Sequence, residues 1–346
     1  MTNVAAHIKN ISLHEFAQKI FQPFLDQEGV TEIAVNRPGE LWYEQYGVWQ
    51  KHDKAEIDSK LLKSFAVALA SFNETAVDDL RPLLSGTLET GERIQVVMYP
   101  ATIDKTIISV TLRKPSKNNF SHASYIEKQF YRKVAVKKST DQDKQELIDL
   151  YAKRDIPLFM ERAVEQGKTI VFAGATGSGK TSYMKTLVDY IPLSCRLITI
   201  EDTAEVKFYK HKNYVHLFFT EEAVGSYEAI ITSGHLLKTC FRMKPDRILL
   251  SEIRGGEAWD FLKVINSGHG GSMTSIHAGS VREALEGIIT RCYQNPECRN
   301  LSYAVIKNIV LSCIDVVCHI NCRSGKRYLN DLYFKDADLQ NLEGND

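Results

Sequence analysis

The sequence predicts an α/β protein with a mostly parallel sheet in its second half, preceded by a smaller α+β domain. The chain has 346 residues, which at about 100–200 residues per domain indicates two domains. After Asp155, short apolar runs alternate with helical segments, as in parallel sheets that are covered on both faces. In the first 115 residues, strands and helices are mixed without this regular alternation, which indicates an α+β arrangement.

The first domain is predicted to contain two helices and several short strands. A capping-box pattern at Ser12–Glu15 predicts the start of an amphipathic helix, which either packs on its own domain or lies on a membrane surface. A second helix is expected over Ser59–Phe72. The strands are expected at residues 32–35, 41–44, 83–88, 94–99 and 106–112, with turns at 36–39 and 90–91.

The second domain is predicted to begin after a basic linker. Residues 113–138 hold eight lysines or arginines and a single acid, Glu127. This run either contacts lipid, nucleic acid or a neighbouring subunit's nucleotide, or is simply a solvated linker. We place the linker at 116–155, between domains at 1–115 and 156–346. Strands are expected at 169–173, 196–200, 214–219, 247–250 and 272–276, and helices at 226–243 and 257–265.

Composition excludes several classes of protein. Hydrophobic residues make up 44% of the chain and charged residues 25%, which is unlike a disordered or collagen-like sequence. The formal net charge is zero, which argues against a chain coated with positive charge for wrapping nucleic acid. No apolar run approaches the ~18 residues of a membrane span, and residues 1–21 lack the apolar core of a signal peptide. We therefore expect a cytoplasmic protein.

The seven cysteines are odd in number and form no CxxC pair, so reduced thiols are expected rather than a disulfide framework. Two interpretations apply to the group at Cys313, Cys318, His319 and Cys322. It is either a metal site, although structural zinc sites usually use tightly spaced pairs, or a buried strand over residues 313–320.

A phosphate-binding motif follows the first predicted strand of the second domain. Residues 174–181, GATGSGKT, match G-x-x-x-x-G-K-[ST] and open a helix near Lys180. Glycines let backbone N–H groups curl around phosphates, and the helix N-terminus adds positive potential. Lys180 is expected to bridge the outer phosphates, and the Thr181 hydroxyl to ligate Mg²⁺. Nucleotide binding follows from this motif.

Acidic residues and a histidine end the neighbouring predicted strands. Glu201 and Asp202 follow one strand, Glu252 follows another, and His277 follows a third. Because ligands bind outside the carboxyl ends of parallel strands, we expect these side chains to face the phosphates. One acid would hold the metal or its waters while another activates the attacking water, and His277 would lie beside the terminal phosphate. The alternative for each acid alone is a helix cap.

Four segments in this order resemble the hexameric secretion-ATPase superfamily: GATGSGKT (174–181), TIEDTAEV (199–206), RMKPDRILLSEIRGGEAWDFL (242–262) and SGHGGSMTSIHA (267–278). They are similar to its P-loop, Asp box, Walker B segment and His box. The first domain resembles the family at 31–40, 91–97 and 109–116. Within it, the chain is most similar to the traffic ATPases of type IV secretion and conjugation. It lacks the tetracysteine insert that is usual in type II secretion ATPases.

The resemblance implies a RecA-like P-loop NTPase domain preceded by a PAS-like domain. It implies ATP and Mg²⁺ as cofactors and a ring of six subunits, peripheral on the cytoplasmic face of the inner membrane, with other secretion-system components as partners. The catalytic residues that it implies are Glu201, favoured as the catalytic acid, Glu252 and His277. The implied nucleotide-binding residues are Gly174, Ala175, Thr176, Gly177, Ser178, Gly179, Lys180, Thr181 and Ser182, with Arg93, Arg113 and Arg242. Thr181 is the implied Mg²⁺ ligand, with Glu252 acting through a water.

We expect ATP hydrolysis to drive type IV secretion or conjugative transfer, in pilus biogenesis and substrate translocation, through closure of the first domain onto the second. Three alternatives stay open. The chain is instead a pilus assembly, pilus retraction or type II secretion ATPase; or a motor stimulated by nucleic acid bound to the basic linker; or a platform that is gated by nucleotide binding more than by turnover.

Overall fold

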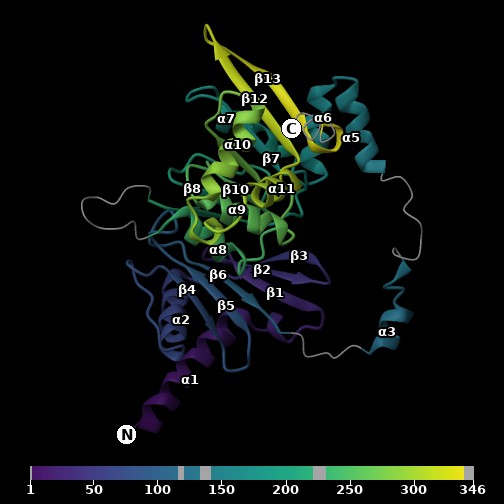
Figure 1. The fold of residues 1–346 in the computed structure, drawn as a ribbon. Helices are drawn as coiled ribbons and strands as arrows, with labels where there is room; N and C mark the ends of the chain where they lie inside the picture. Colours follow the sequence, from purple (N-terminus) through teal and green to yellow (C-terminus); the bar gives the residue numbers. More distant parts are fainter. Residues whose placement is uncertain (1, 116–120, 133–141, 221–230, 339–346) are drawn as a thin grey trace.

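Two β-sheets organise the chain in the computed structural model, one in each half of the sequence (Figure 1). The structure describes residues 2–115, 121–132, 142–220 and 231–338. The first half forms a six-stranded sheet and the second half a seven-stranded sheet, and the two halves lie against each other. The predicted α/β class with a preceding α+β unit is confirmed.

The first sheet is antiparallel, with strand order β3-β2-β1-β6-β5-β4. Alternation along its central strands places Ile33, Val110 and Leu112 in a core shared with two helices. The intervening residues, such as Thr111, face the second domain and are also buried. Its elements are α1 (Thr2–Phe21), η1 (Phe24–Asp26), β1 (Val30–Val35), β2 (Glu40–Gln45), β3 (Val48–Asp53), α2 (Ser59–Phe72), β4 (Leu83–Thr87), β5 (Arg93–Val97) and β6 (Ser109–Arg113).

The second sheet has the order β13-β12-β7-β11-β10-β8-β9, and all its pairs are parallel except β12 with β13. One face packs on α8, α9, α10 and α11, and the other on α5, α6 and α7. The elements are α5 (Gln142–Ala152), α6 (Ile156–Glu165), β7 (Ile170–Ala173), α7 (Lys180–Leu187), η2 (Val188–Tyr190), β8 (Leu197–Glu201), β9 (Tyr214–Phe218), α8 (Ser233–Cys240), β10 (Arg247–Leu250), α9 (Glu257–Asn266), β11 (Met273–Ile276), α10 (Val281–Cys292), η3 (Pro296–Cys298), α11 (Tyr303–Cys313), β12 (Val316–Arg323) and β13 (Lys326–Phe334).

The predicted strands all occur, with bounds within three residues of those expected. The interpretation of Ser12 as a helix start is wrong, because α1 already begins at Thr2 and passes through it without a break. Strand β3 was not predicted, since its residues are mostly exposed and show no apolar alternation; pairing with β2 alone defines it. The helix expected over 226–243 lies partly outside the described residues, and α8 is its described part.

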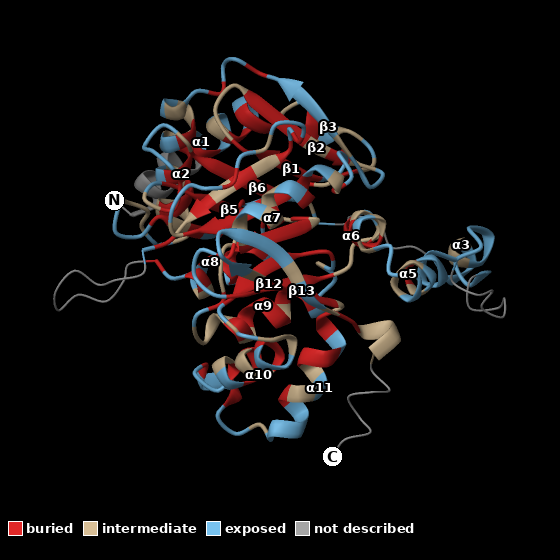
Figure 2. Cartoon of the chain, turned by 90° about the horizontal axis from the view of Figure 1, so that it is seen from above, coloured by how far each residue is buried: buried red, intermediate tan, exposed pale blue. Residues whose placement is uncertain are grey.

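The range predicted as a linker contains two described helices. Helix α3 (His122–Glu127) is exposed and lies apart from both sheets (Figures 1 and 2). Helix α5 instead buries Leu147 in the core of the second domain. Residues 116–120 and 133–138 of the basic run lie outside the described residues, so its role stays a prediction. Within the described ranges, no helix combines the length and apolar character that a membrane crossing requires.

The cysteines considered as metal ligands are separated in the fold. Cys313 ends α11 with its thiol 3.8 Å from the carbonyl oxygen of Leu262, and Cys318 lies buried in β12, 3.7 Å from the sulfur of Met160. Cys322 is exposed. In the part of the chain that the structure describes, no group of three or more His, Cys, Asp or Glu side chains is placed to hold a metal ion.

Arg196 ties the two domains together from inside their interface. Its fully buried side chain donates to Oδ1 of Asn36 in the first domain, to Oδ1 of Asn213 at 2.9 Å and to the carbonyl oxygen of Met243 at 3.0 Å. The guanidinium also lies 5.3 Å from the ring centroid of Trp49. Burial lowers the pKa of Arg196 to about 10, so the group is still charged at neutral pH.

We expect Arg196→Met to lower the free energy of unfolding by about 3 kcal/mol, because the buried Oδ1 of Asn36 would lose its donor and Oδ1 of Asn213 would keep only the amide of Asn36. Urea unfolding of the full chain measures this difference. Arg299→Met, at an exposed position, is the matched control and should change stability by less than about 0.5 kcal/mol. Equal effects of the two substitutions would show that Arg196 does not hold the interface.

Candidate nucleotide site

The candidate phosphate site lies at the carboxyl edge of the second sheet. Strand β7 leads into the P-loop, residues 174–179, and α7 begins at Lys180. Glu201 ends β8, while Glu252 and His277 follow β10 and β11. Since β7, β11, β10 and β8 are neighbours in the sheet and run parallel, their carboxyl ends meet at one edge.

Two glycines fix the shape of the P-loop. Gly174 has a φ of 156°, and a Cβ there would lie 2.4 Å from the carbonyl oxygen of Ile320. Gly179, the N-cap of α7, has a φ of 99°, a conformation that side chains disfavour. Residues 175–177 are exposed, Ser178 is buried, and Thr181 and Ser182 continue into the first turn of α7. The first N–H groups of that helix have no acceptor within it, which suits them to an anion.

The side chain of Lys180 is hydrogen-bonded to the backbone of the P-loop. Its Nζ donates to the carbonyl oxygens of Gly174 at 3.0 Å and Ala175 at 3.1 Å, and lies 3.2 Å from Nδ1 of His277. Burial lowers the pKa of Lys180, an effect that the nearby Glu252 opposes. A buried ammonium bonded to neutral carbonyls gains strongly from a phosphate, because charge-assisted hydrogen bonds are about twice as strong as neutral ones.

A polar chain links Lys180 to the neighbouring strand ends. Nε2 of His277 lies 2.9 Å from Oε1 of Glu252, whose Oε2 accepts from Nε of Arg254 at 3.0 Å. Arg254 in turn contacts Asp202 at 3.2 Å. Burial and the charge of Lys180 lower the pKa of His277, which favours the neutral ring. A neutral ring can accept from Lys180 at Nδ1, whereas Oε1 of Glu252 lies 2.9 Å from Nε2 and makes no hydrogen bond with a described residue.

Glu201 is placed differently from Glu252. It is 1% exposed, and its Oε2 accepts the backbone N–H groups of Glu205 and Val206, both at 2.8 Å. Its Oε1 accepts from the Thr199 hydroxyl at 2.6 Å and lies 3.4 Å from Nδ1 of His216. Burial alone would raise the pKa of Glu201, but these hydrogen bonds lower it below its usual value. The carboxylate is thus engaged in fixing the 202–206 loop.

The pKa of Glu252 shifts in the opposite direction to that of Glu201. Its pKa is raised, mainly by burial, with Lys180 opposing the shift. Its Oε1 contacts Nε2 of His277, and Nδ1 of the same ring contacts Nζ of Lys180. A basic carboxylate next to the phosphate-binding lysine has the properties of a group that takes a proton from water.

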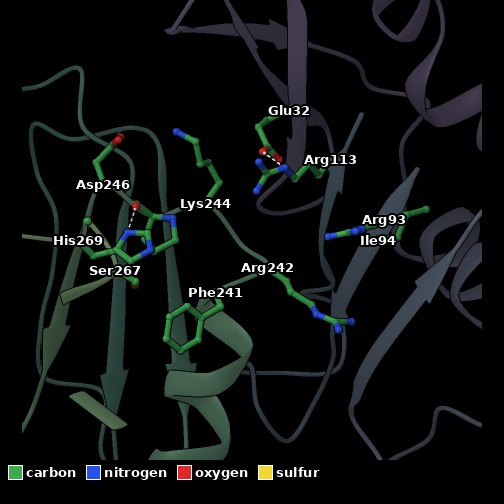
Figure 3. A pocket seen from close by; sticks show the side chains of 12 residues that line it. Glu32, Arg93, Ile94, Arg113, Phe241, Arg242, Lys244, Asp246, Ser267 and His269 are labelled. Atoms are coloured by element: carbon green, nitrogen blue, oxygen red, sulfur yellow. Dashed lines mark hydrogen bonds and ion pairs between the residues drawn. The ribbon is translucent and has the colours of Figure 1, made fainter. Parts of the chain in front are cut away.

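The structure does not bring Arg93, Arg113 and Arg242 to the P-loop of the same chain. All three line a cavity of about 430 Å³ between the domains, with Lys244 and His269 (Figure 3). The second-domain residues of this cavity precede β10 and β11, whereas the phosphate site follows these strands. The cavity therefore lies at the opposite edge of the sheet, about 13 Å away along a four-residue strand.

Cations outnumber acids in the lining of this interdomain cavity, where Arg93, Arg113, Arg242 and Lys244 stand with Glu32 and Asp246. Glu32, Arg113 and Arg93 are direct partners across β1, β6 and β5, so two like charges stand side by side. Such a pair costs stability unless a counter-ion compensates it. Glu32 supplies one, 3.5 Å from Arg113, yet burial raises the pKa of Glu32 to about 7. Arg242 adds a further cation from the second domain.

The motifs did not reveal two cations at the phosphate site. Arg254 contacts Glu252, two residues before it, and its contact with Asp202 depends on the adjacency of β8 and β10. Arg327 comes from β13 and reaches the P-loop, where its Nε donates to the carbonyl oxygen of Gly177 at 3.4 Å. The only sequence signal for Arg327 is its place in a basic cluster, Arg323, Lys326 and Arg327, within a hairpin.

A mostly parallel sheet with a glycine-rich loop, lysine and helix N-terminus at its carboxyl edge defines a P-loop NTPase. A family model described as "Type II/IV secretion system protein" matches residues 124–324. The chain therefore belongs to the Type II/IV secretion system protein family.

Individual relatives cover nearly the whole chain. It is 43% identical over 317 residues to the type IV secretion system protein VirB11 of Brucella suis biovar 1 (strain 1330), covering 91% of this chain and 88% of the relative. It is 35% identical over 326 residues to PtlH of Bordetella pertussis, covering 93% and 95%. The crystal structure of the VirB11 ATPase from the Brucella suis type IV secretion system in complex with sulphate matches with a TM-score of 0.87, 39% identity and coverage of 95% and 99%. The expectation of an ATPase of type IV secretion is confirmed.

Proposed function

We propose that the chain hydrolyses Mg-ATP at the carboxyl edge of the second sheet and that turnover drives substrate translocation and pilus biogenesis in type IV secretion or conjugation. The observation that carries this proposal is the chain of contacts from Lys180 through His277 to Glu252, beside a P-loop, in a relative of VirB11. Phosphate release by the purified protein, compared with its Lys180→Ala variant, tests the activity. Secretion by cells that carry each form tests the role.

The donor atoms at this edge fit Mg²⁺. The Thr181 hydroxyl lies in the first turn of α7 and makes no hydrogen bond with another described residue, and Glu252 offers a carboxylate. Oxygen donors of this kind are those that Mg²⁺ prefers. We assign Thr181 as the protein ligand and Glu252 as a partner through water. When bound with ATP, the ion neutralises charge on the phosphates.

Glu252 is the better placed of the two candidate catalytic acids. Its raised pKa and its contact with His277 suit a group that orients and deprotonates the attacking water. Glu201 acts as a positioning residue, because its oxygens hold the backbone of Glu205 and Val206 and thereby set the loop that carries Asp202. His277 contacts both Glu252 and Lys180. Binding or loss of the terminal phosphate at Lys180 would therefore alter the surroundings of the Glu252 carboxylate.

Closure occurs between subunits in this proposal. The two domains of one chain share a buried interface centred on Arg196, so separating them would expose a desolvated network. The cavity with Arg93, Arg113 and Arg242 also faces away from the chain's own P-loop. In a ring, a head-to-tail interface presents one subunit's arginines to the next subunit's nucleotide. Phosphate charge then draws neighbouring subunits together.

Mixing two inactive variants tests this arrangement. Arg113→Ala keeps its own P-loop but lacks the arginine, whereas Lys180→Ala supplies the arginine but has a defective P-loop. In rings formed from a 1:1 mixture, about one quarter of the interfaces would combine an intact Lys180 with an intact Arg113. We expect the mixture to recover ATPase activity that neither variant has alone. No recovery in rings shown by mass measurement to be mixed would assign Arg113 to its own chain.

The wider assembly follows the same proposal. We propose a homohexamer, peripheral on the cytoplasmic face of the inner membrane, that contacts other secretion-system components there. Residues 1–115 and 156–346 act as the two domains, and the segment between them includes α5, which packs on the second domain. Mass measurement with and without an ATP analogue tests the number of subunits.

A further inference from the structure

The antiparallel hairpin β12–β13 lies directly beside the P-loop. Strand β12 pairs in parallel with β7, and His319 is the partner of Ala173, the last residue before the loop. The chain continues past this point, so Ile320 lies against Gly174. Strand β13 then returns with Arg327 opposite Cys322. The hairpin thus extends beyond the strand end and carries the side chain of Arg327 over the loop.

The side chain of Arg327 contacts the P-loop backbone at Gly177 and Gly179. Its Nε donates to the carbonyl oxygen of Gly177 at 3.4 Å, and its Cδ lies 2.8 Å from the position that a Cβ on Gly179 would take. A residue with a side chain at position 179 would displace the arginine. Because Gly179 has no Cβ, its backbone can adopt the left-handed conformation. The same lack of a Cβ leaves room for the aliphatic part of the Arg327 side chain.

The charge of Arg327 has no acidic partner among the described residues. The side chain is exposed, and of its three nitrogen atoms only Nε makes a hydrogen bond with a described residue. Its two terminal NH₂ groups make no hydrogen bond with a described residue, and they lie beside a loop whose backbone already favours an anion. Placing a cation next to the positive end of α7 is unfavourable until a phosphate arrives. Guanidinium groups bind phosphate oxygens in a planar, two-pronged geometry.

We propose that Arg327 is a second phosphate-binding cation of the P-loop, contributed by the same chain and acting with Lys180 on the phosphates of bound nucleotide. Both side chains rest on loop carbonyls in the structure, Lys180 on Gly174 and Ala175 and Arg327 on Gly177. Bound phosphate offers each cation a stronger, charged acceptor. Arg327 contributes to affinity for ATP and ADP, whereas Glu252 and Lys180 carry the chemical step.

The test compares Arg327→Gln with Lys326→Gln in the full chain. Lys326 is the adjacent exposed cation on β13, and alternation along the strand directs its side chain to the other face. For Arg327→Gln we expect the KM for ATP and the Kd for ADP, measured by calorimetry, to rise about tenfold, with kcat within about twofold of wild type. Lys326→Gln should leave both constants unchanged, and Arg327→Lys should recover part of the affinity.

Thermal melting separates phosphate binding from a merely structural role. We expect nucleotide-free Arg327→Gln to melt at the wild-type temperature and to be stabilised less than wild type by a fixed concentration of ADP. The proposal is overturned if Arg327→Gln binds ADP as wild type does, if Lys326→Gln weakens binding equally, or if nucleotide-free Arg327→Gln melts earlier while keeping normal affinity. Wild-type ATPase activity in the same assay keeps these outcomes distinct from a failure of the proposed function.

Discussion

Replacing Lys180 by alanine is expected to reduce ATP hydrolysis to below about 1% of the wild-type rate, because the side chain supplies the charge at the phosphates and cannot be replaced by water. Lys180 is buried against the carbonyls of Gly174 and Ala175 and touches His277. Its removal therefore deletes a phosphate ligand and breaks the path to Glu252. Steady-state phosphate release and calorimetric ATP binding measure the two losses.

Lys185→Ala is the matched control for Lys180→Ala. Lys185 lies on the same helix, α7, but is more exposed and pairs with Glu205 at 3.2 Å on the surface. Surface ion pairs contribute about 0–1 kcal/mol, so near-normal turnover is expected. If Lys180→Ala hydrolysed ATP at the rate of Lys185→Ala, the P-loop would not be the site of hydrolysis.

Replacing Glu252 by glutamine is expected to lower kcat by about 100-fold or more, since general-base catalysis contributes about 10²–10⁴-fold. Glutamine keeps the size of the side chain but cannot take a proton from water. ATP binding should be retained, because Lys180 and the loop backbone remain. A rapid-mixing measurement of phosphate release, together with nucleotide affinity, separates the loss of chemistry from a loss of binding.

Glu201→Gln is the comparison that decides between the two acids. Its amide oxygen can still accept the N–H groups of Glu205 and Val206, which the carboxylate accepts in the structure. We therefore expect Glu201→Gln to keep more than about a tenth of the wild-type turnover, well above Glu252→Gln. The reverse order, with Glu201→Gln inactive and Glu252→Gln active, would return the catalytic role to Glu201.

Sequence motifs located the P-loop edge of the site well because each motif is continuous. A glycine pattern, an apolar strand and a helix start are encoded within about ten neighbouring residues, as at 169–180. The same logic found Glu201, Glu252 and His277 at strand ends. It did not distinguish the two acids, since their difference depends on contacts with His216 and His277 from neighbouring strands.

The arginines show where sequence resemblance is insufficient. Arg93, Arg113 and Arg242 were expected at the phosphates, yet in the chain they surround the interdomain cavity at the other edge of the sheet. Only the docking of the two domains, fixed by Arg196 and its partners Asn36 and Asn213, reveals which way these arginines face. That docking joins residues some 160 positions apart in the chain.

By itself, the sequence determined the α/β class with a preceding α+β unit, the P-loop and the acids at its strand ends, because local spacing and strand-to-helix order encode them. The tertiary structure decided that Glu201 anchors a loop while Glu252 joins the path to Lys180, and that Arg327 lies on the P-loop. The placements of Glu252 and Arg327 depend on which strands are neighbours and on how a hairpin returns along the sheet edge. Such pairings are long-range, so no local pattern of residues records them.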